Sequence, residues 1–218
     1  MELKSKKINF LGDSITFGAG ASEYSKCFVS LLKEWCSLAE ARNYGVGRTR
    51  IARQGEMKDP VADEDFLMRA EKMDKDADII VVFGGTNDFG HGQASLGKIE
   101  DNTPLTFYGA VHSLIKYLSS EFDAKIVFIT PAHRLNEESC YGCWKPEGVE
   151  QRPLRDYVRA IKEVCALYDV SVLDIFGENT LKGTDAEWCR EYMPDGLHPN
   201  DKGYVILANR IKEYLEAL

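Results

Sequence analysis

Short apolar runs alternate along the chain with longer stretches in which apolar residues recur every three or four positions. The runs predict strands and the periodic stretches predict helices, because side chains repeat with period two in strands and 3.6 in helices. Strands are predicted at residues 7–11, 43–46, 77–83, 125–130 and 170–175, and helices at about 25–41, 107–122, 154–168 and 204–218. The runs at 77–83 and 125–130 are nearly continuous, which suits strands buried on both faces of a parallel sheet.

This alternation is typical of βαβ units and predicts an α/β fold around a parallel sheet. A chain of 218 residues suits one domain, so we expect a single domain over residues 1–218. Asn200 or Asp201 is placed to cap the closing helix. Residues 134–152 are the least regular segment, and we expect them to form a long loop over one end of the sheet. We expect this loop to control which substrate the protein accepts.

Charge and hydropathy narrow the classes of partner. The formal net charge of −8 and the pI near 5.1 argue against nucleic acid, which needs a basic footprint, and favour a small-molecule substrate. The apolar stretch Ile8 to Leu11 is too short for the core of a signal peptide, and no run reaches the length of a membrane span. We therefore expect a cytoplasmic protein with no membrane partner, and the oligomeric state stays open.

Six cysteines are scattered over the chain, at positions 27, 36, 140, 143, 165 and 189. Most lie in helix-like apolar patterns, which predicts buried free thiols. Cys140 and Cys143 have the C-x-x-C spacing of a redox or metal site. They lack a second pair and a histidine at zinc-finger spacing, so the structural interpretation is favoured over metal or disulfide chemistry.

Three polar clusters follow predicted strands or precede the last helix, at residues 12–18, 84–88 and 195–199. In an open parallel sheet, ligands bind beyond the carboxyl ends of the strands. A serine hydroxyl needs an adjacent base that a carboxylate orients, and His198 and Asp195 can supply both to Ser14. The Asn87 amide is a candidate donor to the oxyanion, together with backbone N–H groups of Ser14 and of a glycine in 45–47.

Each of these residues also has an ordinary structural interpretation. Ser14 could cap a helix, Asn87 could be a turn residue, and His198 could be a loop histidine bonded to backbone. Their coincidence at one sheet edge favours catalysis over three unrelated structural roles. Asp13 and Asp88 are different, because a carboxylate pointing into the site would be unhelpful; we expect both to brace loop backbone through hydrogen bonds.

The remaining histidines give weaker indications. His133 and Arg134 follow a predicted strand. They could line the substrate pocket or lie exposed in a loop, and the sequence supports both interpretations equally. His91 and His112 are expected to be surface or helix residues.

Four short sequence blocks resemble, in their order along the chain, those of the SGNH (GDSL-like) hydrolases. The blocks are Gly12-Asp13-Ser14, a glycine after the segment that begins at Asn43, Gly85-Thr86-Asn87-Asp88, and Asp195-x-x-His198. The resemblance spans nearly the whole chain. It implies a three-layer α/β/α sandwich with a flavodoxin-like parallel sheet, and hydrolysis of esters or thioesters through an acyl-enzyme.

The resemblance also implies roles for individual residues. Ser14 would be the nucleophile and, through its N–H, an oxyanion donor; Asn87 would be the side-chain donor, His198 the base and Asp195 its orienting partner. No metal or organic cofactor is implied. One block departs from the pattern, because relatives commonly have the oxyanion glycine where this chain has Arg48. Gly47 is therefore the predicted backbone donor, with Gly45 as the alternative.

The predicted function is hydrolysis of small carboxylic esters with short acyl groups, such as acetyl on a carbohydrate, because no extended apolar segment suits long chains. An acyltransferase with the same triad is an alternative that differs only in the acceptor. A non-catalytic flavodoxin-like module binding an anion at Gly12–Gly20 is another, but it lacks both common glycine-rich phosphate motifs. The G-x-S-x-G elbow of α/β-hydrolases is also missing, since Thr16 takes the place of its second glycine.

Overall fold

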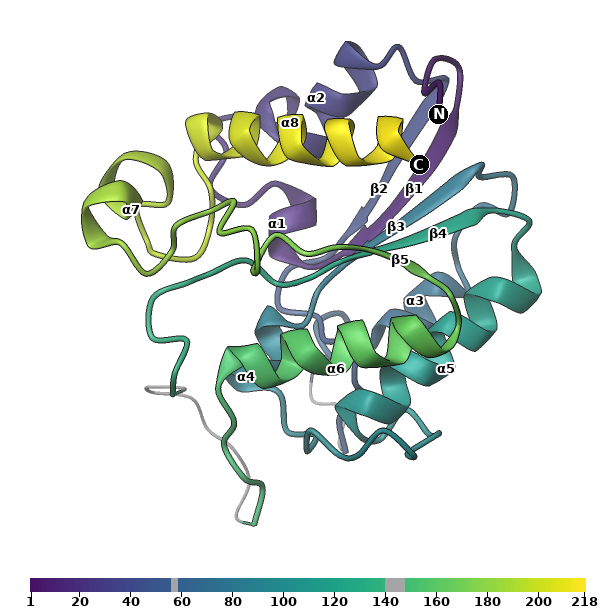
Figure 1. The fold of residues 1–218 in the computed structure, drawn as a ribbon, viewed down its shortest axis with the longest axis vertical. Coiled ribbons are helices and arrows are strands. Elements are labelled where there is room, and N and C mark those ends of the chain that lie inside the picture. The colour runs from purple at the N-terminus through teal and green to yellow at the C-terminus, as the bar shows by residue number, and fades with distance from the viewer. Residues whose placement is uncertain (56–58, 140–147) are drawn as a thin grey trace.

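The computed structural model describes residues 1–55, 59–139 and 148–218. Its centre is a sheet of five parallel strands in the order β2-β1-β3-β4-β5 (Figure 1). The strands are β1 (Lys7–Gly12), β2 (Glu40–Gly45), β3 (Ile79–Phe83), β4 (Lys125–Ile129) and β5 (Ser171–Leu173). This order is that of flavodoxin-like sheets, as predicted.

Helices cover both faces of the sheet. They are α1 (Ser14–Phe17), α2 (Phe28–Trp35), α3 (Phe66–Ala70), α4 (Thr86–His91), α5 (Phe107–Glu121), α6 (Leu154–Leu167), α7 (Ala186–Tyr192) and α8 (Asp201–Ala217), with a short 3₁₀ helix at Tyr24–Lys26. Figure 1 shows α2 and α8 on one face and α3, α5 and α6 on the other. The arrangement is the predicted three-layer α/β/α sandwich.

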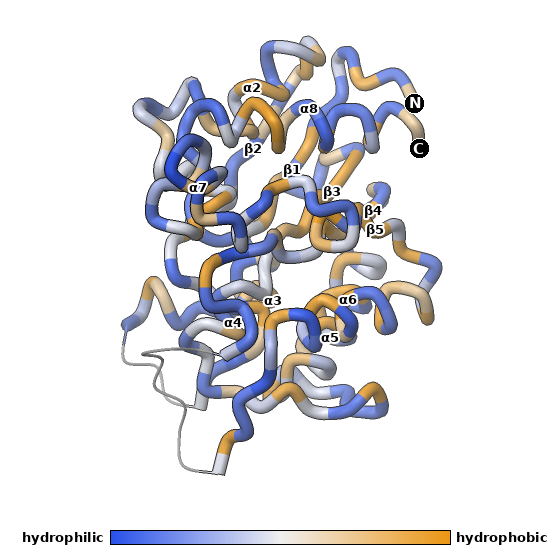
Figure 2. Tube along the Cα trace, turned by 60° about the vertical axis from the view of Figure 1, so that its left-hand side comes forward, coloured by the Kyte–Doolittle hydropathy of each residue, from blue (hydrophilic) through white to orange (hydrophobic). Residues whose placement is uncertain are grey.

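The apolar side chains of β3 are divided between the two layers because successive strand residues point to opposite faces. Ile79, Val81 and Phe83 pack in the cluster that includes α2 and α8. Ile80 and Val82 pack in the cluster that includes α3, α5 and α6. All five residues are buried, which explains the nearly continuous apolar run in the sequence. In Figure 2, α6 alternates between hydrophobic and hydrophilic stretches, as a helix with one covered side does.

The helix predicted over residues 25–41 is wrong at its C-terminal end. Helix α2 stops at Trp35, and Ser37 takes a left-handed conformation with φ 50°. The chain then enters β2 at Glu40, which pairs with Lys7 of β1, so this strand begins earlier than the predicted residue 43. The helical spacing misled because Leu38, beyond the helix, is buried in the same core as α2.

Several smaller expectations are also settled. Cys27, Cys36, Cys165 and Cys189 are buried free thiols. Burial raises the pKa of Cys165 to about 12. Cys140 and Cys143 lie outside the described residues, as does the middle of the expected 134–152 loop.

Residue Asn200, rather than Asp201, caps α8, and its side chain accepts hydrogen bonds from two backbone N–H groups of the first turn. Over the described ranges, no helix is long and apolar enough to cross a membrane.

The register of the sheet brings distant sequence segments to one edge. Gly12 at the end of β1 pairs with Gly45 of β2 on one side and with Phe83 of β3 on the other. The polar clusters at residues 12–18 and 84–88, which contain Ser14 and Asn87, therefore follow neighbouring strands at the same edge of the sheet.

Candidate active site

Ser14 is the first residue of α1, directly after β1. The cap of this helix is Asp13, not Ser14, because an oxygen of the Asp13 carboxylate accepts the Ile15 N–H at 2.9 Å. The Ser14 hydroxyl is therefore not needed for capping. Asp13 is 2% exposed, and this burial raises the pKa of its carboxyl group to about 6, against the opposing pull of His198 and Arg69.

The structure brings Ser14, His198 and Asp195 into one hydrogen-bonded series. Ser14 Oγ lies 2.9 Å from His198 Nε2, and His198 Nδ1 lies 2.6 Å from Asp195 Oδ2. The other carboxylate oxygen, Oδ1, accepts the backbone N–H groups of Leu197 and His198 at 2.9 and 2.7 Å. Partial burial raises the pKa of Asp195, but these hydrogen bonds outweigh it and hold the pKa below its ordinary value. The carboxylate is therefore ionised at neutral pH.

Residues at the start of α8 contact α1 and the segment that follows it. The Tyr204 hydroxyl of α8 lies 3.0 Å from the carbonyl oxygen of Ile15 and 2.8 Å from that of Ala19. Asp201 accepts both the N–H and the hydroxyl of Ser22, at 2.8 and 2.6 Å. The nucleophile turn is thus held directly to the helix that follows His198.

Asn87 lies in the first turn of α4, directly after β3. One of its Nδ2 hydrogens is donated to the Thr49 carbonyl at 3.0 Å, and its Oδ1 lies 3.2 Å from His91 Nε2. The neighbouring Asp88 carboxylate accepts the N–H groups of Ile51 and Ala52 at 3.0 and 2.8 Å. The expectation that Asp13 and Asp88 brace backbone is confirmed by these contacts.

The two glycines considered for the oxyanion site differ in their surroundings. The Gly45 N–H is donated to Asn43 Oδ1 at 2.8 Å, and a methyl group on Gly45 would meet the Phe17 backbone nitrogen at 2.1 Å. Gly45 is therefore a packing residue beneath α1. A methyl group on Gly47 would meet only Ser14 Cβ within 4 Å, at 3.9 Å. Gly47 therefore lies beside the serine and has space around its Cα.

Arg48 follows Gly47 in a turn that closes with the Thr49 N–H donating to the Val46 carbonyl at 3.4 Å. Its φ is 67°, the left-handed conformation that glycine adopts most readily at the third position of such a turn. The backbone at Arg48 thus has the shape expected where relatives commonly have glycine. Its side chain is 72% exposed.

His91 is the last residue of α4, so the expectation that it lies at the surface or in a helix is confirmed, and its side chain also contacts Asn87. Its other ring nitrogen, Nδ1, lies 3.2 Å from Arg50 Nη1. Burial and the charges of Arg50, Arg48 and Arg134 lower the pKa of His91 to about 4, so its ring is neutral at pH 7. The i, i+4 spacing of Asn87 and His91 is the one sequence signal for this contact, and it appears only once both are placed on a helix.

His133 and Arg134 have structural partners. His133 Nδ1 lies 2.9 Å from Glu137 Oε2, and its ring stacks on Phe176 with centroids 3.8 Å apart. Arg134 Nη1 donates to Thr86 Oγ1 at 3.1 Å, which ties this loop to α4. His112 on α5 is buried, within 2.9 Å of the Tyr168 hydroxyl and 2.8 Å of the Ile99 carbonyl, and the expectation that it lies in a helix is confirmed.

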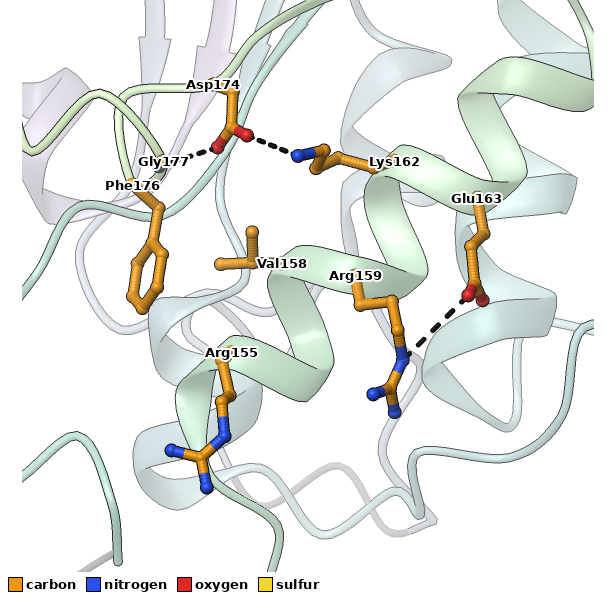
Figure 3. A pocket seen from close by; sticks show the side chains of 8 residues that line it. All are labelled: Arg155, Val158, Arg159, Lys162, Glu163, Asp174, Phe176 and Gly177. Atoms are coloured by element: carbon orange, nitrogen blue, oxygen red, sulfur yellow. Dashed lines mark hydrogen bonds and ion pairs between the residues drawn. The ribbon is translucent and has the colours of Figure 1, made fainter.

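A pocket of about 340 Å³ lies beside α6 and the segment after β5, and it does not include the triad (Figure 3). Lys162 pairs there with Asp174, and Arg159 lies 3.9 Å from Glu163. Arg155, which also lines the pocket, forms an ion pair with Glu138. Each charged side chain of the lining therefore already has an oppositely charged partner. Among residues 1–55, 59–139 and 148–218, no cluster of three His, Cys, Asp or Glu side chains is arranged to hold a metal ion.

Comparison with known proteins agrees with the fold described above. A solved structure 32% identical superposes with a TM-score of 0.85 over 100% of this chain and 99% of the other. A Lactobacillus plantarum protein, 26% identical, gives 0.83 over 98% of each chain. The lipase/acylhydrolase from Enterococcus faecalis, 25% identical, gives 0.66 over 97% of this chain and 96% of the other.

No curated protein sequence matches this chain. The model of the GDSL-like Lipase/Acylhydrolase family matches residues 10–206, which include every residue of the site described above. The chain belongs to the GDSL-like lipase/acylhydrolase family, and this membership supports a hydrolase.

Proposed function

We propose that the protein is a serine esterase that hydrolyses small carboxylic esters through an acyl-enzyme on Ser14. The observation that carries this proposal is the series Ser14 Oγ, His198, Asp195, with contacts of 2.9 and 2.6 Å. A hydroxyl within hydrogen-bond reach of an imidazole that a carboxylate orients has the requirements of an activated nucleophile.

In the proposed reaction, Ser14 Oγ attacks the ester carbonyl carbon while His198 Nε2 takes the hydroxyl proton. Asp195 holds the Nδ1–H tautomer and stabilises the imidazolium that forms. The imidazolium then gives the proton to the departing alcohol, leaving an acyl group on Ser14. A water molecule, deprotonated by His198, releases the acid and restores the serine. No step requires a metal or an organic cofactor.

Three donors are proposed for the negative charge on the carbonyl oxygen. They are the N–H of Ser14, the N–H of Gly47 and the second Nδ2 hydrogen of Asn87. In support, the first-turn amides of a helix have no intrahelical partner, and Gly47 lies beside Ser14. The alternative donor at Gly45 is disfavoured because its N–H already binds Asn43. Loss of one such donor typically lowers the rate about 10²- to 10³-fold.

Short acyl groups, such as acetyl on a carbohydrate, are the proposed substrates. Among the described residues, two large exposed apolar side chains belong to segments that adjoin the triad: Phe17, three residues after Ser14, and Leu135, whose N–H donates to the Gly196 carbonyl. Two isolated side chains do not make the extended apolar surface that a long acyl chain needs to be removed from water.

Hydrolysis of a p-nitrophenyl ester series from acetate to decanoate tests both parts of the proposal. The wild type should prefer acetate or butyrate, and Ser14→Ala and His198→Ala should each lose more than about 10³-fold in kcat. Ser120→Ala, an exposed serine on α5, is the matched control and should retain full activity. Adding glycerol as acceptor and measuring free acid against ester product distinguishes hydrolysis from acyl transfer. Undiminished turnover by Ser14→Ala would contradict the mechanism, and a preference for decanoate would contradict the substrate class.

A further inference from the structure

An oxyanion donor on an asparagine side chain works only if the amide faces the right way. The carboxamide oxygen and nitrogen have nearly the same shape but opposite hydrogen-bonding roles, so a rotation by 180° would present an acceptor to the oxyanion. The Thr49 carbonyl can only accept, and it therefore requires Nδ2 on its side of Asn87. The opposite atom, Oδ1, requires a donor, and His91 Nε2 is the atom beside it, at 3.2 Å.

The tautomer of His91 is decided by Arg50. A guanidinium carries donors only, so the nitrogen that faces it, His91 Nδ1 at 3.2 Å, must be the unprotonated acceptor. The ring proton of the neutral histidine then lies on Nε2, where it is donated to Asn87 Oδ1. Arg50 is itself held by an ion pair with Asp63 and by the Arg48 carbonyl at 3.2 Å.

We propose that His91 is a positioning residue for the ester-hydrolysing site: set by Arg50 as the Nε2–H tautomer, it fixes the Asn87 amide so that one Nδ2 hydrogen faces the oxyanion. The inference rests on the proposed function, since the amide needs this orientation only if it stabilises an oxyanion. Within the described residues, the side-chain hydrogen bonds of the His91 ring go to Asn87 and Arg50.

Burial and the cations around His91 keep it in the required neutral form. The cations that face it are Arg50 and Arg48 from the segment after β2 and Arg134 from the loop after β4. A second ring proton would lie on Nδ1 and point at the Arg50 guanidinium. With its pKa lowered to about 4, the His91 ring therefore stays neutral at neutral pH.

A double-mutant cycle tests the inference with p-nitrophenyl acetate. His91→Leu removes the donor, whereas His91→Gln supplies an amide that can accept from Arg50 and donate to Asn87. His91→Leu should lower kcat about 10-fold with little change in KM, because an oxyanion contact acts in the transition state. The size of this loss follows from the net worth of one hydrogen bond, about a factor of ten. His91→Gln should stay within about 3-fold of wild type because its amide can still donate to Asn87. In the Asn87→Ala background, His91→Leu should have no further effect.

Several outcomes would overturn the inference without touching the esterase proposal. One is an unchanged kcat in His91→Leu while Asn87→Ala is impaired. Another is an equal loss in both backgrounds, which is the signature of a structural role for His91. Nitrogen-15 NMR of the ring gives a readout besides turnover: the inference requires His91 to be the Nε2–H tautomer between pH 6 and 8, and an Nδ1–H tautomer would contradict it. A wild type inert toward every ester would instead contradict the proposed function.

Discussion

Replacing Asp13 by asparagine isolates the effect of burying a carboxyl group beside the nucleophile. Asp13 is 2% exposed, and its carboxylate accepts the Ile15 N–H that begins α1. An asparagine side chain has nearly the same shape and keeps a carbonyl oxygen for that N–H, so the cap survives. What the variant removes is the ability to ionise in a site where burial disfavours the charge.

The size of the effect follows from the pKa of Asp13, which rises from 3.8 to about 6 on folding. This rise in pKa means that folding disfavours the charged form of Asp13 relative to the neutral form by roughly 3 kcal/mol of free energy. Because the folded pKa is raised, the unfolded chain loses its proton first as pH increases, and the wild type loses stability between about pH 4 and pH 6. Asparagine does not titrate. The free energy of unfolding of Asp13→Asn minus that of the wild type should therefore grow by roughly 2 kcal/mol from pH 4 to pH 7.

Urea unfolding of both proteins at pH 4, 5, 6 and 7 measures this difference. Other carboxyl groups titrate over the same range, but they are common to both proteins and cancel in the difference. A difference that stays constant with pH would show that folding does not perturb the Asp13 carboxyl group. A difference that falls with pH would show that the charged form is stabilised, and either result would refute the reasoning.

Two further substitutions, one of them with a matched control, and one chemical probe test separate parts of the structure. Gly45→Ala would place a methyl group 2.1 Å from the Phe17 backbone nitrogen, so it should destabilise the protein by about 2 kcal/mol or more in thermal unfolding. Gly55→Ala, with nothing within 4 Å of the added carbon, should change stability by less than about 0.5 kcal/mol, and equal effects of the two would contradict the close approach of β2 and α1. Asp195→Asn should lower kcat about 10³- to 10⁴-fold with a small change in KM in steady-state kinetics, because its amide would favour the wrong tautomer of the triad histidine; retention of more than a tenth of kcat would argue against the orienting role. The Cys165 thiol, whose pKa burial raises to about 12, should escape iodoacetamide at pH 8 until the protein unfolds, and native-state labelling detected by peptide mass spectrometry would show that the site opens.

The sequence was informative where a residue's role follows from its type and its place at a strand end. Ser14, Asp195 and His198 were grouped on chemistry and order in the chain, and the structure brings their side chains together. Strands β1, β3 and β4 can be predicted because buried parallel strands are apolar runs, whereas β2 is mostly polar and half-buried and begins three residues before the predicted position. Short helices such as α1 and α4 were missed because they hold too few residues to show a period of 3.6.

Features that depend on tertiary contacts could not be predicted in this way. The spacing of α2 continued to Leu38 although a left-handed Ser37 separates Leu38 from the helix, since a core position in a turn has the same sequence signature as one in a helix. The contact from His91 to Asn87 can be predicted only if α4 is known to be a helix. The tautomer of His91 can be predicted only if Arg50, from a different segment, is known to face its ring. The open side of Gly47 and the crowded side of Gly45 are likewise properties of packing.

The central claim is that Ser14 is the nucleophile, and the most direct measurement is the identity of the residue that an ester-like phosphorylating agent modifies. In that reaction the serine oxygen bonds to phosphorus as p-nitrophenolate leaves diethyl p-nitrophenyl phosphate, and peptide mass spectrometry locates the diethyl phosphate group. If Ser14 is the nucleophile, one adduct is expected, on Ser14, formed in step with the loss of esterase activity. Inactivation with the adduct on another residue, or an active enzyme that remains unmodified at Ser14, would contradict it.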